Sequence, residues 1–203
     1  MAGQMMLAME NQKTLATYEK SVQSYIEGTA HVTTGYFKEW IDQVLLYLKR
    51  DARIFEIGSG FGRDAAYITS CGYAIECSDA VTGFIDILRK RGLSVQSFNV
   101  LTDELKDSYD CVLAAAVFLH LTPEQLNVIL QKMHNGLHTN GILACTFKEG
   151  IGTEWSIAKV GNPRYFCYWQ PENLRKVLEN AKFTVKSLTS MDGWIYVIAQ
   201  RTH

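Results

Sequence analysis

The sequence predicts an α/β fold in which a doubly wound, mostly parallel sheet is covered by helices on both faces. Strand-like apolar runs alternate with amphipathic helical segments from residue 54 to residue 147, which is typical of parallel strands joined by right-handed crossovers. A glycine-rich turn over residues 58–62 joins the first of these strands to a helix. The last two extended runs, residues 183–188 and 194–199, flank Asp192-Gly193 and predict an antiparallel hairpin at the end of the sheet.

Composition indicates one domain and limits its partners. The 203 residues are 47% hydrophobic and 20% charged, enough for a single well-buried core, so one domain over residues 1–203 is predicted. The formal net charge of −1 disfavours nucleic-acid binding driven by phosphate contacts. The five cysteines are scattered, without a C-x-x-C pair or metal-ligand spacing, which predicts reduced thiols, no metal and a cytoplasmic location. Residues 1–10 are too short for a signal peptide or membrane span.

The order of elements predicts where a ligand binds. Two amphipathic helices, residues 11–28 and 36–48, precede the first strand. Strands are predicted at residues 54–57, 73–77, 94–98, 109–115 and 142–147, and helices at residues 62–70, 81–91, 123–136 and 171–180. Ligands of such sheets bind where the strands end. The glycine turn, Asp79, Asn99 and residues 114–120 are therefore expected around one crevice.

Polar residues in this crevice match a ligand with an adenosine end and an amino-acid end. Asp79 follows the first glycine by about 20 residues, the spacing at which a carboxylate accepts hydrogen bonds from ribose hydroxyls; the alternative is a carboxylate that caps the next helix. Asn99 and the backbone N–H of Val100 are placed to contact an adenine edge. Glu56 and Arg63 flank the glycines and are placed to meet an ammonium and a carboxylate. The glycine turn either directs free backbone N–H groups toward the ligand or is only a tight connection between a strand and a helix.

These motifs together resemble a known family. Glu56-Ile57-Gly58-Ser59-Gly60-Phe61-Gly62-Arg63-Asp64 resembles the cofactor motif of class I S-adenosylmethionine (SAM)-dependent methyltransferases, in the small-molecule branch whose turn continues Gly-Arg-Asp. Asp79 and residues 109–112, 119–122 and 137–141 match at the expected spacing. Asn140-Gly141 replaces the Gly-Gly usual in the last of these turns. The resemblance implies a Rossmann-like, seven-stranded core over residues 51–203, with SAM as methyl donor and S-adenosylhomocysteine (SAH) as product.

The resemblance also implies the residues of the site. Residues 12–50 resemble the N-terminal lid helices, whose tyrosine closes over the cofactor, and residues 148–170 resemble the segment that borders the acceptor. The expected cofactor contacts are Tyr18, Tyr25, Glu56, Gly58, Ser59, Gly60, Gly62, Arg63, Asp79, Asn99, Val100 and Ala115. Asn99 stands where the family often has Asp. No D/N-P-P-Y signature follows the fourth strand, which argues against a nucleic-acid base as acceptor.

The expected chemistry is an in-line displacement on the methyl carbon of SAM. A hydroxyl or thiol acceptor benefits from a base, and His120 is the candidate because imidazole titrates near neutral pH; the alternative is a structural histidine at a helix start. Lys148 and Tyr165 either orient the acceptor or hold the lid. The motifs do not identify the acceptor.

Two other functions compete with a methyltransferase. A nicotinamide oxidoreductase would share the acidic residue, but its G-x-G-x-x-G pattern requires the third glycine at position 63, where this chain has Arg63 after Gly62. A non-catalytic subunit of the same fold would act by binding a partner. The intact glycine turn and the presence of Asp79 argue against such a non-catalytic subunit.

Overall fold

The computed structural model describes the backbone of residues 2–202 and the side chains of residues 9–202. The strands are β1 (Ile54–Ile57), β2 (Ile75–Asp79), β3 (Val95–Ser97), β4 (Tyr109–Ala114), β5 (Leu137–Glu149), β6 (Thr153–Ser156), β7 (Arg164–Trp169), β8 (Phe183–Met191) and β9 (Trp194–Arg201). The helices are α1 (Ala2–Lys20), α2 (Val22–Glu27), α3 (Gly35–Leu45), α4 (Arg63–Ser70), α5 (Thr82–Lys90), α6 (Pro123–Gly136) and α7 (Pro171–Asn180), with a 3-10 turn η1 (Phe118–His120).

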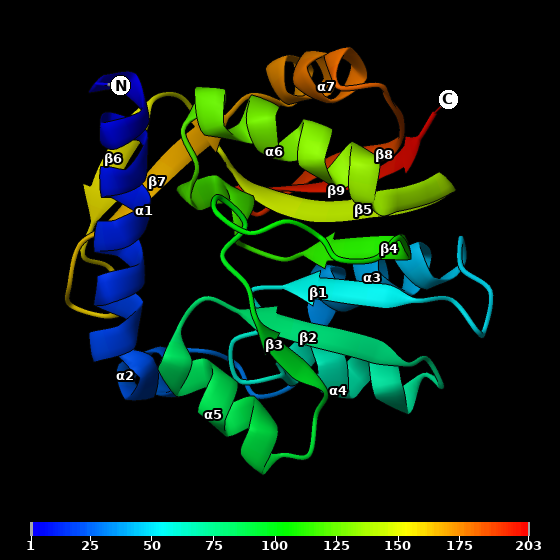
Figure 1. The fold of residues 1–203 in the computed structure, drawn as a ribbon, viewed down its shortest axis with the longest axis horizontal. Coiled ribbons are helices and arrows are strands. Elements are labelled where there is room, and N and C mark those ends of the chain that lie inside the picture. Colours follow the sequence, from blue (N-terminus) through cyan, green and yellow to red (C-terminus); the bar gives the residue numbers. More distant parts are fainter. Residues whose placement is uncertain (1, 203) are drawn as a thin grey trace.

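The sheet confirms the predicted doubly wound, mostly parallel arrangement. Strands β3, β2, β1, β4 and β5 lie side by side in that order and are parallel. Strand β9 pairs antiparallel with β5 on one side and with β8 on the other, so the predicted C-terminal hairpin completes a seven-stranded core. Figure 1 shows the helices on both faces of this sheet and α1 along the edge at which β1, β2 and β4 end.

The sheet has two strands beyond the predicted seven. Residues 148–170, expected only as a segment bordering the acceptor, form the antiparallel pair β6–β7, and β7 joins the end of β5 at Lys148 and Glu149. The aromatic residues of β7, Tyr165, Phe166, Tyr168 and Trp169, favour an extended chain. Because β5 runs on past the end of β4, this hairpin is carried beyond the core sheet, beside α1 (Figure 1).

Alternate residues of the central strands face two different helix layers. In β4, Cys111 and Leu113 pack with α3 and α4, whereas Val112 and Ala114 pack with α6 and α7. Successive side chains of a strand point to opposite faces, and a parallel sheet covered on both faces is therefore apolar at nearly every position. This is why the strands read as continuous apolar runs in the sequence.

Some predicted boundaries are confirmed and others are wrong. Helices α6 and α7 begin and end at the predicted residues. Each begins with proline, and Thr122 with Gln125 forms a capping box before α6, which accounts for their starts. The predicted helix over residues 11–28 instead divides at Ser21 into α1 and α2. Strand β5 begins at Leu137 rather than 142, since Asn140 takes a positive φ within an irregular strand instead of ending a turn.

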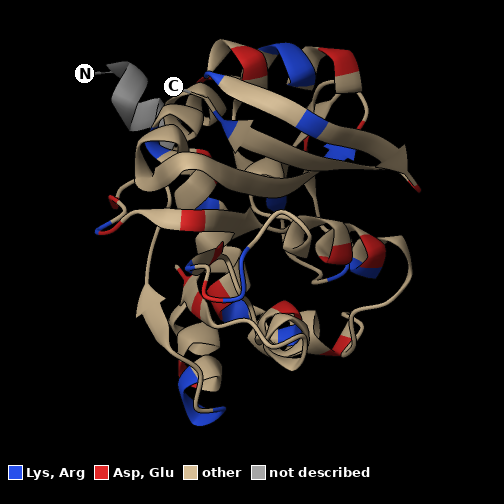
Figure 2. Cartoon of the chain, turned by 90° about the vertical axis from the view of Figure 1, so that its right-hand side faces the viewer, with Lys and Arg blue, Asp and Glu red and all other residues tan. Residues whose placement is uncertain are grey.

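Charged side chains of both signs are mixed on one side of the molecule (Figure 2). Lys and Arg positions are interspersed with Asp and Glu on the side of the molecule drawn in Figure 2. Among the helices of the described residues, none is both long and apolar enough to cross a bilayer.

The glycine turn after β1 is fixed by packing as well as by backbone conformation. Gly62, at the start of α4, has a φ of +83°, and a Cβ there would lie 2.8 Å from Leu88 Cδ2 and 2.9 Å from Leu93 Cδ1. Any side chain at this position would collide with the residues that hold α5 against β2 and α4. Gly92 also has a positive φ, of +74°, but no atom of the described residues outside its chain neighbours lies within 4 Å of its Cβ position.

This contrast predicts a difference between two glycine variants. Gly62→Ala should lower the free energy of unfolding by about 2–4 kcal/mol, from left-handed strain plus overpacking, whereas Gly92→Ala should lower it by only about 1 kcal/mol. Urea denaturation of the two variants measures both values. Equal losses would show that the leucine contacts do not constrain the turn.

Candidate functional site

Two adjoining cavities lie where the parallel strands end. The first, of about 100 Å³, is called the Asp79 pocket, and the second, of about 260 Å³, is called the Trp194 pocket. Both are lined by Tyr25, Gly58, Gly60, Ala115 and Ala116. The glycine turn and the residues after β4 therefore form a wall that the two pockets share, and ligands in the two pockets would both contact it.

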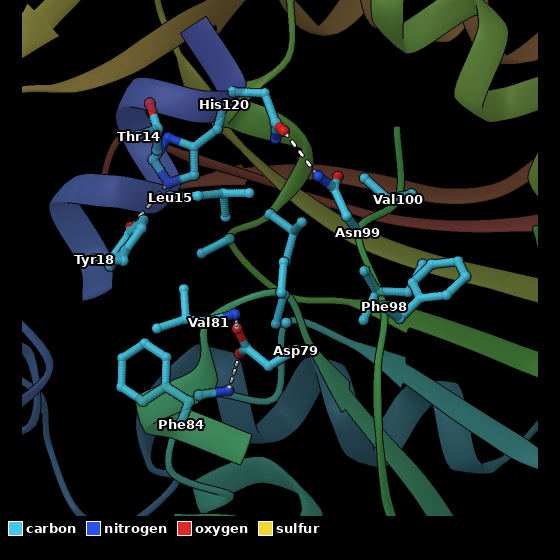
Figure 3. A pocket seen from close by; sticks show the side chains of 18 of the residues that line it. Thr14, Leu15, Tyr18, Asp79, Val81, Phe84, Phe98, Asn99, Val100 and His120 are labelled. Carbon is cyan, nitrogen blue, oxygen red and sulfur yellow. Dashed lines mark hydrogen bonds between the residues drawn. The ribbon is translucent and has the colours of Figure 1, made fainter. Parts of the chain in front are cut away.

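Asp79 is held rigidly in the first pocket. Its carboxylate accepts a hydrogen bond from the Gly60 N–H at 2.9 Å and another from the Val81 N–H at 2.9 Å. The side chain is only 6% exposed, and burial raises the pKa of Asp79 to about 6 although these hydrogen bonds act in the opposite direction. A largely ionised acceptor group at neutral pH thus lies on the wall of the pocket (Figure 3).

Helix α1 covers the Asp79 pocket with one of its faces. Asn11, Thr14, Leu15 and Tyr18 line the pocket and follow the spacing i, i+3, i+4, i+7 of a single helix face. Asn11 Oδ1 accepts from Asn99 Nδ2 at 3.0 Å, and Thr14 Oγ1 accepts from the backbone N–H of residue 165 at 3.0 Å. The sequence prediction named Tyr18 and missed Asn11 and Thr14, although the helical spacing from Tyr18 points to them.

A chain of hydrogen bonds joins this helix to β7 and η1. Arg164 Nη1 donates to the Tyr18 hydroxyl at 3.0 Å, and the Tyr18 hydroxyl lies 2.9 Å from His120 Nε2. His120 Nδ1 lies 2.5 Å from the carbonyl oxygen of Tyr165. Since a carbonyl only accepts, Nδ1 carries the proton and Nε2 accepts from Tyr18. Figure 3 shows Tyr18 and His120 on the same side of the pocket.

Burial keeps His120 neutral. Its pKa is lowered to about 4, first by loss of solvation and further by the positive charge of Arg164. Arg164 is itself only 5% exposed, and its Nε atom has no hydrogen-bond partner among the described residues. The imidazole is therefore an uncharged group with a fixed tautomer at neutral pH.

Glu56 is a buried carboxyl group beneath the glycine turn. It is 2% exposed, and its Oε2 atom has no hydrogen-bond partner among the described residues. Burial, reinforced by the nearby carboxylate of Asp64, raises the pKa of Glu56 to about 8. A carboxyl group with an unpartnered oxygen is stabilised by a cation or donor placed beside it.

The Trp194 pocket is lined by aromatic rings and charged side chains. Its rings are those of Tyr25, Phe37, Phe61, Trp194 and Tyr196, and its charged groups are those of Arg63, Asp64 and Lys159. Arg63 and Asp64 form an ion pair with an Nε–Oδ1 distance of 2.7 Å. The rings come from α2, α3, β9 and the glycine turn, elements far apart in the sequence.

The structure brings together most of the residues predicted from the sequence. The Asp79 pocket is lined by Tyr18, Tyr25, Gly58, Gly60, Asp79, Asn99, Val100, Ala115 and His120. Ser59 and Arg63 line the Trp194 pocket, and Glu56 and Gly62 are packed behind the turn.

Lys148 and Tyr165 line neither pocket. The Lys148 ammonium lies 3.8 Å from the centroid of the Trp194 ring, so Lys148 contacts a residue that lines the Trp194 pocket without lining it itself. The Tyr165 ring packs edge-on against Trp155, and its backbone carbonyl is the part that reaches His120. Sequence reasoning missed Phe37, Lys159 and Tyr196 of the Trp194 pocket, because no local motif marks them.

Comparisons with known proteins identify both a family and a fold. The family model described as tellurite resistance protein TehB matches residues 29–146. No curated protein is significantly similar in sequence. A SAM-dependent methyltransferase from Methanosarcina mazei has a similar structure, with a TM-score of 0.69 and 15% identity over 79% of this chain and 97% of that chain.

Two further solved structures have the same fold. A TehB-like SAM-dependent methyltransferase from Corynebacterium glutamicum has a TM-score of 0.62 and 16% identity, over 82% of this chain and 86% of that one. The 1,6-didemethyltoxoflavin-N1-methyltransferase of Burkholderia thailandensis, solved with 1,6-didemethyltoxoflavin and SAH, has a TM-score of 0.64 and 19% identity, over 81% and 77%. The fold of this chain is that of the SAM-dependent methyltransferases.

The neutral state of His120 predicts a pH dependence of stability. In the unfolded chain His120 becomes protonated as the pH falls below its pKa of about 6.5. In the folded chain it stays neutral until the pH reaches its lowered pKa of about 4. The wild type should therefore lose about 3 kcal/mol relative to His120→Asn as pH falls through this window. Denaturant unfolding of both proteins between pH 4 and pH 7 measures the difference. A constant difference would show that His120 titrates normally.

Proposed function

This chain belongs to the family of tellurite resistance protein TehB, whose model matches more than half of it, and we propose that it transfers a methyl group from SAM to a small-molecule acceptor. The observation that carries the proposal is the pair of pockets that share the glycine turn. The adenosine end of the donor would occupy the Asp79 pocket and its amino-acid end would reach Ser59 and Arg63 of the Trp194 pocket, the rest of which would hold the acceptor. The other residues that line the two pockets suit the adenosine end of a donor in one and an acceptor in the other.

The residues present fit SAM. Asp79 would accept from the ribose hydroxyls, and Asn99 would contact the adenine edge at the end of β3. Glu56 would receive the ammonium of the amino-acid end, which supplies the positive charge that its unpartnered Oε2 atom lacks. Gly60 leaves room for the ligand, since the nearest atom to its Cβ position is Tyr25 Cε1 at 3.8 Å.

The chain contributes mainly orientation and the exclusion of water. When bound, SAM supplies a methyl carbon made electrophilic by its sulfonium. The protein encloses the donor beneath α1 and holds the acceptor against the shared wall, and orientation of this kind contributes about 7–11 kcal/mol to the lowering of a barrier. Thr146 stabilises that wall, because its hydroxyl accepts from the Ala116 N–H at 2.9 Å.

His120 is the candidate base, but Tyr18 and His120 line the Asp79 pocket and not the Trp194 pocket, so an acceptor's proton would reach His120 only from an acceptor atom that extends past the shared wall to Tyr18. The Tyr18 hydroxyl donates to Nε2 and already accepts from Arg164, which leaves one lone pair to take a proton while its own passes to His120. The second reading of the same contacts is structural, with His120 holding α1 closed against η1. His120→Ala distinguishes these two roles. Loss of a base should lower turnover, whereas loss of a structural contact that holds α1 in place should lower SAM affinity.

The proposal is tested by binding and by transfer. SAM and SAH should bind in calorimetry and NAD should not, and methyl-labelled SAM should label a member of an acceptor panel that includes tellurite, thiols and aromatic acids. Asp79→Asn should weaken SAH by about 10-fold or more, since a charged hydrogen-bond acceptor is lost. Asp86→Asn, an exposed carboxylate on α5, is the control. NAD binding without SAM binding, or cofactor binding with no transfer to any acceptor, contradicts the proposed function.

Glu56 gives a prediction that does not depend on turnover. At pH 7 its carboxyl group is mostly protonated because its pKa is about 8, and an ammonium placed beside it lowers that pKa. SAH binding should therefore release about one proton at pH 7, and the release should decline toward pH 9. Calorimetry in phosphate and in Tris measures it. Glu56→Gln should bind SAH without the release; an unchanged release would assign the proton to another group.

A further inference from the structure

The charged side chains that line the Trp194 pocket are two cations, Arg63 and Lys159, and one carboxylate, Asp64. Lys159 lines the pocket, and its ammonium lies 4.1 Å from the centroid of the Tyr25 ring. Among the described residues, no carboxylate lies within ion-pair distance of this ammonium, and the carboxylate of Asp64 is already paired with Arg63. The pKa of Lys159 is lowered to about 8, by partial burial and then by the charges of Arg164 and Arg63. Its charged neighbours are thus cations.

The backbone around Lys159 is held in place. Lys159 has a φ of +74°, a conformation that lysine rarely adopts without support. Arg164 supplies that support, since its Nη2 donates to the carbonyl oxygen of Ala158 at 2.5 Å while its Nη1 holds Tyr18. The Lys159 side chain also lies along Gly28, whose Cβ position is 3.3 Å from Lys159 Cγ. The ammonium is therefore positioned over the pocket.

The rest of the pocket wall suits a flat apolar ligand. Phe37, Trp194 and Tyr196 lie on the side toward α3 and β9, and Tyr25 lies on the side beneath Lys159. Aromatic side chains prefer stacked or edge-on contacts with other rings. Trp194 and Phe37 are only partly buried, so both retain surface that a ligand can cover.

We propose that the methyl acceptor is an aromatic molecule that carries a carboxylate or a similarly charged acidic group, and that Lys159 selects it by pairing with that group. This inference rests on the proposed function, because it assigns the Trp194 pocket to the acceptor. Arg164 acts as a positioning residue for Lys159. The alternative partner of Lys159 is the carboxylate of SAM itself. If Lys159 pairs with the acceptor, its loss weakens binding of the acceptor; if it pairs with SAM, its loss weakens binding of the cofactor.

The test uses a pair of probes that differ in charge and not in shape. With SAH saturating, 2-naphthoate should bind about two- to fivefold more tightly than 2-naphthamide, the upper part of the range for a partly exposed ion pair, and the preference should fall at high salt. Lys159→Met should abolish the preference and leave SAH affinity unchanged. Acetate, which has the charge without the rings, should bind far more weakly than 2-naphthoate. Titration calorimetry measures all of these affinities.

A matched variant controls for the loss of a positive charge. Lys13 is also an exposed lysine over an aromatic ring, with its ammonium 4.3 Å from the centroid of Trp155, and it lines neither pocket. Lys13→Met should keep the preference for 2-naphthoate.

Three outcomes would overturn the inference. Equal binding of the two naphthalene probes to the wild type would show that charge does not select the acceptor. Weakening of SAH by Lys159→Met would assign the lysine to the cofactor's carboxylate. Acetate binding as tightly as 2-naphthoate would point to an inorganic or aliphatic anion. Each outcome is read in protein that binds SAH, so failure of the proposed function, which removes SAH binding or transfer, is distinguished from failure of this inference.

Discussion

The arrangement of the site depends on carboxylates that satisfy the N–H groups at the start of α5. Val81, the residue before this helix, has no polar side chain with which to cap it, and Asp79 instead accepts from the Val81 N–H while it also accepts from Gly60. Glu19 of α1 accepts from the N–H groups of Thr82 and Gly83 at 2.8 and 3.1 Å. Free N–H groups at a helix start attract negative charge. The N-terminus of α5 is thus hydrogen-bonded to Asp79, in the wall of the Asp79 pocket, and to Glu19 of α1, the helix that covers this pocket.

Two buried ionisable side chains beside the pockets, those of Glu56 and Arg164, form no ion pair within the described part of the fold. Glu56 is buried and pairs with no cation, and Arg164 is buried and pairs with no carboxylate. Burial of unpaired ionisable groups opposes folding. An ammonium at the amino-acid end of the proposed donor would favour the ionised form of Glu56. Arg164 instead uses its guanidinium to hold the Tyr18 hydroxyl and the carbonyl oxygen of Ala158. Part of the folding cost of these buried groups is therefore offset by a ligand and part by hydrogen bonds that position the site.

The sequence predicted the sheet core and the donor side of the site because both follow from local patterns. Strand and helix periods placed β1 to β5, and Pro123 and Pro171 fixed the starts of α6 and α7. Strand ends meet at one edge in a parallel sheet, so Asp79 and Asn99 could be placed beside the glycine turn. The β6–β7 pair was missed because its pairing with β5 is a tertiary contact. Lys148 lies on the same face of β5 as Thr146 but two residues further along, beyond the pocket that Thr146 lines.

The two pockets differ in how the chain encodes them, and this explains why the family motif identifies a donor and leaves the acceptor open. Half of the residues that line the Asp79 pocket lie in the turns directly after β1, β2, β3 and β4, so their places in the sequence can be predicted from the strands. The Trp194 pocket adds α2, α3, the turn before β7 and the start of β9, whose approach is set by long-range packing. Residues there can change without disturbing the strand ends. Acceptor specificity must therefore be inferred from the rings and charges that packing brings together, of which Lys159 and Trp194 are the most informative.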